Sequence, residues 1–247
     1  MLSCCVLAPA RAADLPVTVA RVKQSVVGVG TFLKTRSPAV RFVGTGFIVG
    51  DGLNVITNAH VVPELDTEKL ETLGIVIAVG ERVEFRPAVL VGSDREHDLA
   101  HLTIGGAPLP ALQLGEGADM AEGRELAFTG FPLGMALGLH PVTHRALLSA
   151  ITPIVLPSLN SGKLGANAIV ALQRPRFPIY QLDATAYPGN SGSPVYDPQT
   201  GLVYGIINMV FVKGLKETAI TNPSGITYAV PVVHARELMQ GKGAARK

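Results

Sequence analysis

Three side chains of this sequence could together activate a hydroxyl group for nucleophilic attack. Ser191 lies in the run Gly189-Asn190-Ser191-Gly192-Ser193-Pro194. A serine hydroxyl is a weak nucleophile unless a base lies within hydrogen-bond reach and other groups receive the charge of the attacked carbonyl. His60 is a candidate base, and Asp94 or Asp98 could hold its imidazole in the correct tautomer. Spacing alone does not choose between the two aspartates.

The residues around Ser191 favour a tight turn that could form an oxyanion hole. Gly189 and Gly192 have no Cβ, so the backbone there can adopt conformations that other residues avoid. We expect the amides of Gly189 and Ser191 to point at one spot, where the oxyanion of a tetrahedral intermediate would form. The same residue types are common in ordinary turns, so this run carries little weight without His60.

The elements around the other candidates are short strands. His60 follows the β-branched run 55–57 and precedes Val61, Val62 and Pro63, which places it at a strand end. Asp98 opens another apolar run, 99–104, after a polar stretch. The order His, Asp, Ser along the chain is the one that two-barrel proteases of the chymotrypsin type use.

The composition predicts an all-β fold, either a Greek-key sandwich or Greek-key β-barrels. The chain has 247 residues, 47% of them hydrophobic, with 27 Gly and 18 Pro between short β-branched runs. This length allows two barrels of roughly 100 residues each. We expect a first barrel over 14–122 with His60 and Asp98, and a second over 123–234 with Ser191, so that the site forms where the barrels meet. A short closing helix from about residue 231 leads into a tail, within 235–247.

These segments resemble those of the HtrA (DegP-type) branch of trypsin-like serine proteases, over about residues 25 to 240. Five runs in matching order carry the resemblance: Thr57-Asn58-Ala59-His60-Val61-Val62, Asp98-Leu99-Ala100-His101-Leu102, Gly130-Phe131-Pro132-Leu133-Gly134, the stretch from Asp183 and Ala184 to Gly189-Asn190-Ser191-Gly192 and Pro194, and Tyr228-Ala229-Val230-Pro231. The resemblance selects Asp98 over Asp94. It covers a protease domain only, whereas relatives often continue into peptide-binding PDZ domains.

The resemblance implies peptide hydrolysis through an acyl-enzyme. Ser191 would attack, His60 would take and later return the proton, and Asp98 would orient His60. The amides of Gly189 and Ser191 would hold the oxyanion. No cofactor is expected, the partner is a polypeptide substrate, and a homotrimer like that of some relatives is possible.

Substrate preference should depend on residues just before the nucleophile and on the strand after it. The expected pocket residues are small, apolar or uncharged: Thr185, Ala186, Tyr187, Gly205, Ile206 and Ile207. A pocket without an acid should not select Lys or Arg. We therefore expect small to medium aliphatic side chains before the cut bond.

Some positions depart from the pattern of the family. Ser193 stands where many relatives carry Gly, and His101 where an apolar residue is usual. A histidine facing a barrel interior needs a hydrogen-bond partner or must stay neutral, so His101 is either structural or pH-sensitive. The stretch 140–173 is longer than in relatives, and we interpret it as a surface insertion in preference to a regulatory or substrate-facing loop.

Two other functions would fit parts of this pattern. One is a protease fold that binds a polypeptide or partner without cutting it, or that needs activation. The other is an esterase using the same three residues. The esterase ranks last because Ser193, two residues after Ser191, replaces the glycine of a Gly-x-Ser-x-Gly elbow.

The remaining features concern location and partners. Residues 1–13 contain both cysteines and Ala-x-Ala cleavage sites, typical of a truncated signal peptide, and predict a periplasmic or, second, a secreted protein. A formal net charge of +2 with scattered basic residues gives no indication of nucleic-acid binding. No apolar run is long enough to span a membrane. His97 and His101 lack the pattern of a metal site.

Overall fold

The computed structural model describes residues 15–79, 82–117, 120–134, 138–153, 177–209 and 225–242. The expected signal peptide over 1–13 lies outside these residues. Residues 154–173 of the longer stretch also lie outside them, whereas its earlier part contains strand β8 (Val142–Pro153).

The first half of the described chain forms a closed antiparallel barrel with strand order β1-β2-β3-β6-β5-β4. Its strands are rich in Val, Ile and Thr, which fit a pleated, half-buried surface. They are β1 (Val26–Phe32), β2 (Val40–Val49), β3 (Asn54–Asn58), β4 (Thr72–Val79), β5 (Arg82–Asp94) and β6 (Leu99–Ile104). A short 3-10 helix, η1 (Ala59–Val61), follows β3.

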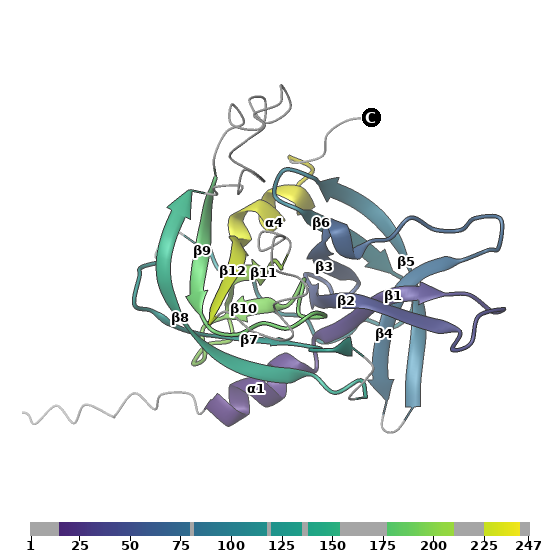
Figure 1. The fold of residues 1–247 in the computed structure, drawn as a ribbon, viewed down its shortest axis with the longest axis horizontal. Helices are drawn as coiled ribbons and strands as arrows, with labels where there is room; N and C mark the ends of the chain where they lie inside the picture. The colour runs from purple at the N-terminus through teal and green to yellow at the C-terminus, as the bar shows by residue number, and fades with distance from the viewer. Residues whose placement is uncertain are drawn as a thin grey trace, which may run out of the picture.

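The second half forms another closed barrel with strand order β10-β11-β12-β9-β8-β7. Its strands are β7 (Glu125–Gly130), β8 (Val142–Pro153), β9 (Pro178–Asp183), β10 (Pro194–Tyr196), β11 (Val203–Ile207) and β12 (Ile226–Pro231). The two barrels lie side by side (Figure 1). Helix α4 (Val232–Met239) follows β12 and contacts β6, β11 and β5. The expected all-β, two-barrel fold with a closing helix is confirmed.

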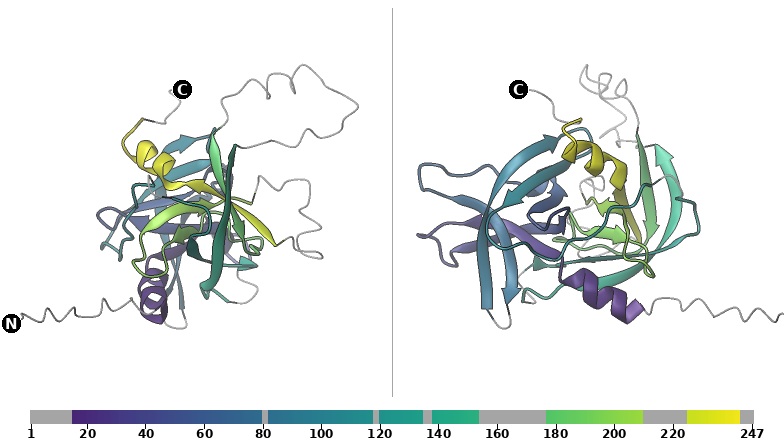
Figure 2. Two further views of the ribbon diagram at one scale, coloured as in Figure 1. Left: turned by 90° about the vertical axis from the view of Figure 1, so that its left-hand side faces the viewer. Right: turned by 180° about the vertical axis from the view of Figure 1, so that it is seen from behind.

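Helix α1 (Leu15–Lys23) was not predicted from the sequence. It lies below the barrels, away from α4 (Figure 2). Its Val22 is fully buried, and the Thr18 hydroxyl donates to the carbonyl of Gln199 in the second barrel at 3.1 Å. The helix leads into β1, so it connects the first barrel to the second. Only Thr18 and Val22, four residues apart, are buried in this helix, so its sequence has only a weak amphipathic pattern.

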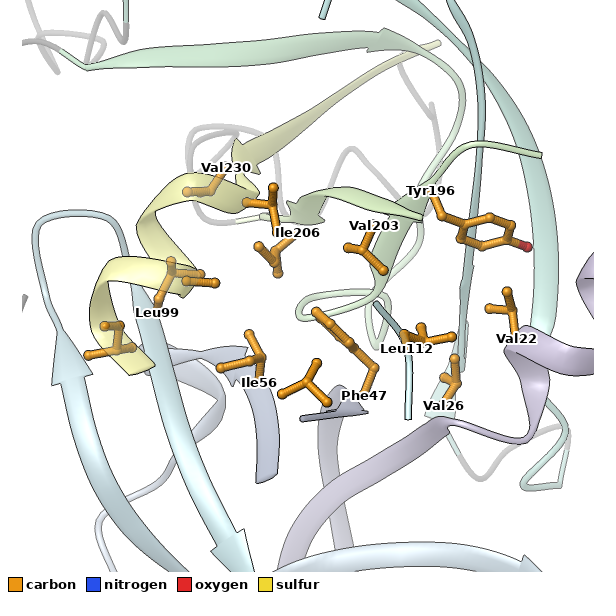
Figure 3. Packing of buried hydrophobic residues seen from close by; sticks show 14 of the residues in the cluster. Val22, Val26, Phe47, Ile56, Leu99, Leu112, Tyr196, Val203, Ile206 and Val230 are labelled. Carbon is orange, nitrogen blue, oxygen red and sulfur yellow. The ribbon is translucent and has the colours of Figure 1, made fainter. Parts of the chain in front are cut away.

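Three apolar cores hold the fold together. One fills each barrel, around Ile48 and Leu102 in the first and around Phe128 and Leu182 in the second. The third lies between the barrels and joins residues of both with α1 and α4 (Figure 3). It contains Val22, Phe47, Ile56, Leu99, Tyr196, Val203, Ile206 and Val230. Because these side chains are buried and come from both barrels, the shared core fixes the position of one barrel against the other.

His101 of β6 has the partner that its position requires. Its Nε2 lies 2.6 Å from the side-chain oxygen of Asn54 on the neighbouring strand β3. The side chain is buried, and this burial lowers the pKa of His101 below its ordinary value. Since an amide oxygen accepts a hydrogen bond from a neutral imidazole, His101 is satisfied without carrying charge.

Candidate active site

The ends of two neighbouring strands bring His60 and Asp98 together. Strands β3 and β6 are antiparallel, and Asn58 pairs with Leu99, so the residues after β3 and before β6 lie at the same end of the barrel. His60 Nδ1 lies 2.6 Å from Asp98 Oδ2, and the backbone N–H of His60 donates to Oδ1 at 2.9 Å. A carboxylate only accepts, so Nδ1 carries the proton and Nε2 can act as a base.

Asp98 is fixed by further contacts on both sides. Its backbone carbonyl accepts from the amide of Ala59 and from the side chain of Asn58, both at 3.0 Å. The side-chain amide of Asn208, which follows β11 of the second barrel, donates to Asp98 Oδ2 at 2.9 Å. Asp98 has a φ of 54°, in the left-handed region that few non-glycine residues adopt. These bonds hold that conformation and aim the carboxylate at His60.

Asp94, the alternative that spacing left open, faces another histidine. Its Oδ2 lies 2.6 Å from Nδ1 of His97, and its Oδ1 accepts from the amides of Glu96 and His97. Asp94 therefore closes the turn before β6. The structure places Asp98, and not Asp94, against His60.

Ser191 lies on a turn of the second barrel that packs against the first. The amide of Thr45 in β2 donates to the Ser191 carbonyl at 2.9 Å, and the amide of Gly192 donates to Ile207 at 2.9 Å. Gly192 has a φ of 87°, and a Cβ there would lie 2.0 Å from the Thr45 carbonyl oxygen. A glycine is required for this approach, which seats the nucleophile's turn beside the strands that lead to His60.

The peptide between Pro188 and Gly189 has a defined direction. The amide of Leu133 donates to the Pro188 carbonyl at 2.7 Å. In a trans peptide the N–H points opposite to the carbonyl, so the Gly189 N–H points away from Leu133. Neither this N–H nor that of Ser191 donates to another residue in the described part of the chain. Both remain available for an oxyanion.

Thr45 was not identified from the sequence, and it links three parts of the site. Its hydroxyl donates to the Gly189 carbonyl at 2.7 Å and accepts from the amide of Phe131 at 3.1 Å. Thr45 thereby joins β2 of the first barrel to the loops of the second. The run Gly44-Thr45-Gly46 was the available signal, because two glycines around a threonine in a strand indicate close backbone approach.

The contact of Asn208 with Asp98 was likewise not predicted from the sequence. It is fully buried, and it directly follows the apolar run of β11. A buried Asn at a strand end must have hydrogen-bond partners, which is the only signal the sequence offers.

The six residues expected to form the substrate pocket do not share one environment. Ile206 and Ile207 are fully buried and belong to the core between the barrels and to that of the second barrel, respectively. Ala186 is buried, and its amide donates to the Thr227 hydroxyl at 3.0 Å. Gly205 is buried between β10 and β12. Thr185 and Tyr187 are partly exposed, so these two can contact a bound peptide.

Within the described residues, no three His, Cys, Asp or Glu side chains converge as metal ligands would. None of the helices described is both long and apolar enough to cross a membrane.

Comparisons with known proteins agree with this geometry. A sequence model of the family described as "Trypsin-like peptidase domain" matches residues 44–206. The chain is 29% identical over 197 residues to a "Probable periplasmic serine endoprotease DegP-like" of Pseudomonas fluorescens, covering 80% of this chain and 34% of that protein. It is 30% identical over 192 residues to a protein of the same name from Halomonas elongata, covering 78% and 33%. The chain thus spans about one third of the length of the relatives it matches.

Solved structures show the same fold. The structure titled "HtrA-type protease AlgW with tripeptide" has a TM-score of 0.63 at 25% identity, over 92% of this chain and 63% of that one. The "serine endoprotease from Yersinia pestis" has a TM-score of 0.62 at 24% identity, over 93% and 66%. Residues 44–206, which the family model matches, include His60, Asp98 and Ser191.

Proposed function

We propose that this chain, which belongs to the trypsin-like peptidase family, is a serine endopeptidase that cuts polypeptides through an acyl-enzyme. The observation that carries the proposal is the 2.6 Å contact between His60 Nδ1 and Asp98 Oδ2. It fixes the tautomer in which Nε2 of His60 is the free base, at the junction where the Ser191 turn packs on the first barrel.

In the proposed reaction, Ser191 Oγ attacks the carbonyl carbon of the scissile bond while His60 Nε2 takes its proton. The oxyanion is held by the N–H groups of Gly189 and Ser191. His60 then gives the proton to the leaving amine, and a water molecule repeats the cycle on the ester. Asp98 stays ionised and stabilises the imidazolium. No step in this sequence requires a cofactor.

The relatives bear on the cellular location of the proposed reaction. Both relatives described above are named periplasmic endoproteases, which supports a periplasmic location for this chain. We further propose that small to medium aliphatic side chains precede the cut bond, with Thr185 and Tyr187 as the exposed contacts. A homotrimer remains a prediction, and light scattering of the purified protein would test it.

The proposed activity can be tested by labelling with a fluorophosphonate, which reacts only with an activated serine. We expect a covalent adduct that mass spectrometry maps to Ser191. Ser191→Ala and His60→Ala should abolish labelling, and each should lower peptide turnover on the order of a millionfold. A folded protein that binds polypeptides but is never labelled would contradict the proposal and favour a binding protein with a protease fold.

A further inference from the structure

A depression lies beside Gly189, apart from the residues of the expected pocket. It has a volume of about 660 Å³ and extends from Gly189 toward β2 and the turn that holds the Pro188 carbonyl. Its apolar lining consists of Pro38, Val40, Phe42, Val43, Leu133 and Pro188. None of the six residues predicted to contact the side chain before the cut bond lines it. A polypeptide bound at the site would therefore place another of its residues there.

The position of Gly189 decides which part this is. Its N–H is assigned to the oxygen of the attacked carbonyl, so a chain that passes Gly189 has the scissile bond at that point. The residues expected to contact the acyl side, Thr185 and Tyr187, lie outside the depression. Because the depression includes Gly189 but neither Thr185 nor Tyr187, we assign it to the residues after the cut bond.

The strand that walls the depression can also guide an extended chain. Strand β2 pairs with β3 only from Phe47 to Val49, so over Val40–Val43 its edge away from β1 has no described strand as partner. Val43 is the extra residue of a bulge, because Gly44 pairs with Val29 whereas Phe42 pairs with Gly30. Such an edge is suited to a substrate that adds itself as a short strand.

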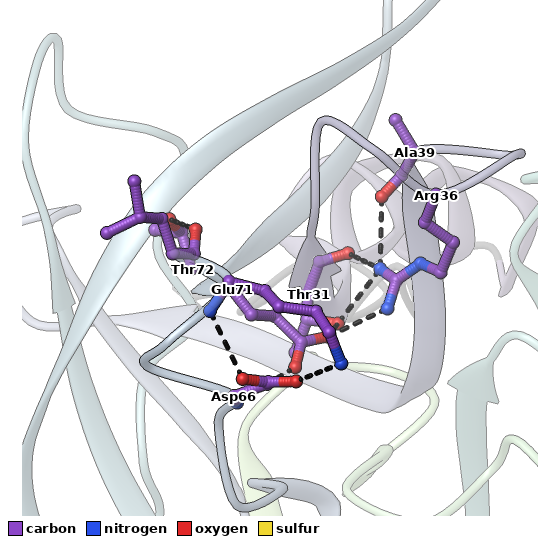
Figure 4. Close-up of polar contacts among 8 residues, drawn as sticks. Thr31, Arg36, Ala39, Asp66, Glu71 and Thr72 are labelled. Atoms are coloured by element: carbon purple, nitrogen blue, oxygen red, sulfur yellow. Dashed lines mark hydrogen bonds and ion pairs between the residues drawn. The ribbon is translucent and has the colours of Figure 1, made fainter.

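The charges around the depression have one sign. The charged residues among its lining are Arg36 and Arg41, and none of the described lining residues is acidic. Arg36 is already neutralised: its guanidinium contacts Glu71 Oε1 at 2.7 Å and donates to the carbonyls of Thr31 and Ala39 (Figure 4). Arg41 is exposed, and no described carboxylate lies within ion-pair distance of it. Of the two arginines, Arg41 is therefore the one whose charge can pair with a ligand.

We propose that this depression binds the residues after the cut bond, a proposal that rests on the proposed function. Its apolar walls select a bulky apolar side chain, and Arg41 selects an acidic side chain at the next residue. The apolar walls remove the first side chain from water. The guanidinium of Arg41 attracts the carboxylate of the second. Arg36, held by Glu71, Thr31 and Ala39, serves as a fixed wall.

The test compares peptides that are identical before the cut bond and differ after it. One carries Leu then Glu, a second Leu then Lys, and a third Gly then Glu, each with a quenched fluorophore. For the wild type we expect kcat/KM for Leu-Glu to exceed that for Leu-Lys by about threefold to tenfold, since an exposed ion pair makes a modest contribution. Leu-Glu should also exceed Gly-Glu, because only Leu fills the apolar depression.

Variants at two exposed arginines separate a local contact from overall charge. Arg41→Glu should reverse the preference between Glu and Lys. Arg82→Glu makes the same charge change on β5, outside the depression, and should leave the preference as it is. The wild-type preference should approach unity as NaCl rises from about 0.05 to 0.5 M, because the pair is exposed. A role of Arg41 in folding alone would not produce this salt dependence.

The outcomes separate this inference from the proposed function. If the peptides are cut but Arg41→Glu leaves the preference unchanged, the selection by Arg41 is wrong and the peptidase proposal stands. If Ser191→Ala binds Leu-Glu more tightly than Leu-Lys in fluorescence anisotropy while the wild type cuts neither, the depression is confirmed and the peptidase proposal is wrong. If the peptides are neither cut nor bound, both are overturned.

Discussion

Asn208 of the second barrel and Asp98 of the first are joined by a hydrogen bond of 2.9 Å between the side-chain amide and Oδ2. The same oxygen contacts His60 Nδ1 at 2.6 Å. The carboxylate that orients the proposed base is therefore itself oriented from the opposite barrel. Correct docking of the barrels is thus a condition for a correctly placed His60.

Replacing Asn208 tests this dependence. Asn208→Ala removes one of the bonds that fix Asp98, and hydrogen bonds to charged groups are among the stronger ones. We expect kcat to fall on the order of tenfold, with little change in KM because Asn208 is fully buried. Steady-state kinetics and the rate of fluorophosphonate labelling would measure the effect. Asn208→Asp should reduce both further, since it places a like charge against Asp98.

The control for Asn208→Ala is a variant that keeps its hydrogen-bonding group at another contact between the barrels. Thr45→Ser keeps a hydroxyl at another link between the barrels and should retain most of the activity. Unchanged kcat and labelling in Asn208→Ala would show that the contact with Asp98 has no part in orienting His60.

Gly130 provides the space that Ser193 occupies. A Cβ at Gly130 would lie 1.9 Å from the Ser193 hydroxyl and 2.8 Å from Asn190 Oδ1. Gly130→Ala should therefore lower the free energy of unfolding by about 1–3 kcal/mol, as overpacking does. Urea denaturation would measure the loss.

A second substitution identifies the clashing group. The loss caused by Gly130→Ala should be smaller in a Ser193→Gly background, where the hydroxyl is gone. Gly105→Ala is a matched control, because a Cβ at Gly105 meets nothing within 4 Å. Equal losses with and without Ser193 would contradict this account.

The sequence predicted more of the fold than of the contacts that position the site. Short Val-rich and Ile-rich runs and the neighbours of His60 and Ser191 predict strands, turns and strand ends, because these depend on local patterning. Spacing did not separate Asp94 from Asp98, since both precede β6 and only the three-dimensional turn decides which carboxylate faces His60.

Local sequence patterns could not predict the contacts between the barrels. The bond from Asn208 to Asp98 joins residues 110 positions apart, and that from Thr45 to Gly189 spans 144. The pocket expectation treated residues 205–207 as walls, although Ile206 and Ile207 pack into two cores. In a strand, neighbouring side chains point to opposite faces, so the side chains of a continuous run do not all face one pocket.

Glu71 should make stability depend on acid pH. Hydrogen bonds from Thr31 and Arg36 lower the pKa of Glu71 from its ordinary value of 4.5 to about 2. The folded state therefore favours the charged carboxylate. The resulting stabilisation is complete above pH 4.5 and is lost as the pH falls toward about 2.

Glu71→Gln removes this titration. The free energy of unfolding, measured in urea across the acid range, should fall less steeply with decreasing pH in this variant than in the wild type. Glu125→Gln, which breaks an exposed pair with Arg145, is the control and should keep the slope of the wild type. A slope that Glu71→Gln leaves unchanged would show that other carboxylates cause the acid sensitivity.

His234 should make stability depend on pH in a higher range. It stacks on His97 with ring centroids 3.6 Å apart, at the contact between α4 and the turn before β6. Phe177 meets both rings, Asp94 faces His97, and Glu237 lies 3.4 Å from His234 Nδ1. Burial, and then the nearby His97, lower the pKa of His234 below its ordinary value of 6.5.

The direction of the effect follows from this lowered pKa. The folded state favours neutral His234, so its contribution to stability is complete above pH 6.5 and is lost as the pH falls below it. Urea unfolding between about pH 7.5 and 5.5 should therefore show a decreasing free energy, and His234→Gln should reduce the slope. His101 and His144 have pKa values that burial also lowers, so the slope should shrink without vanishing. The exposed His140 is the control, and equal slopes in His140→Gln and His234→Gln would contradict the prediction.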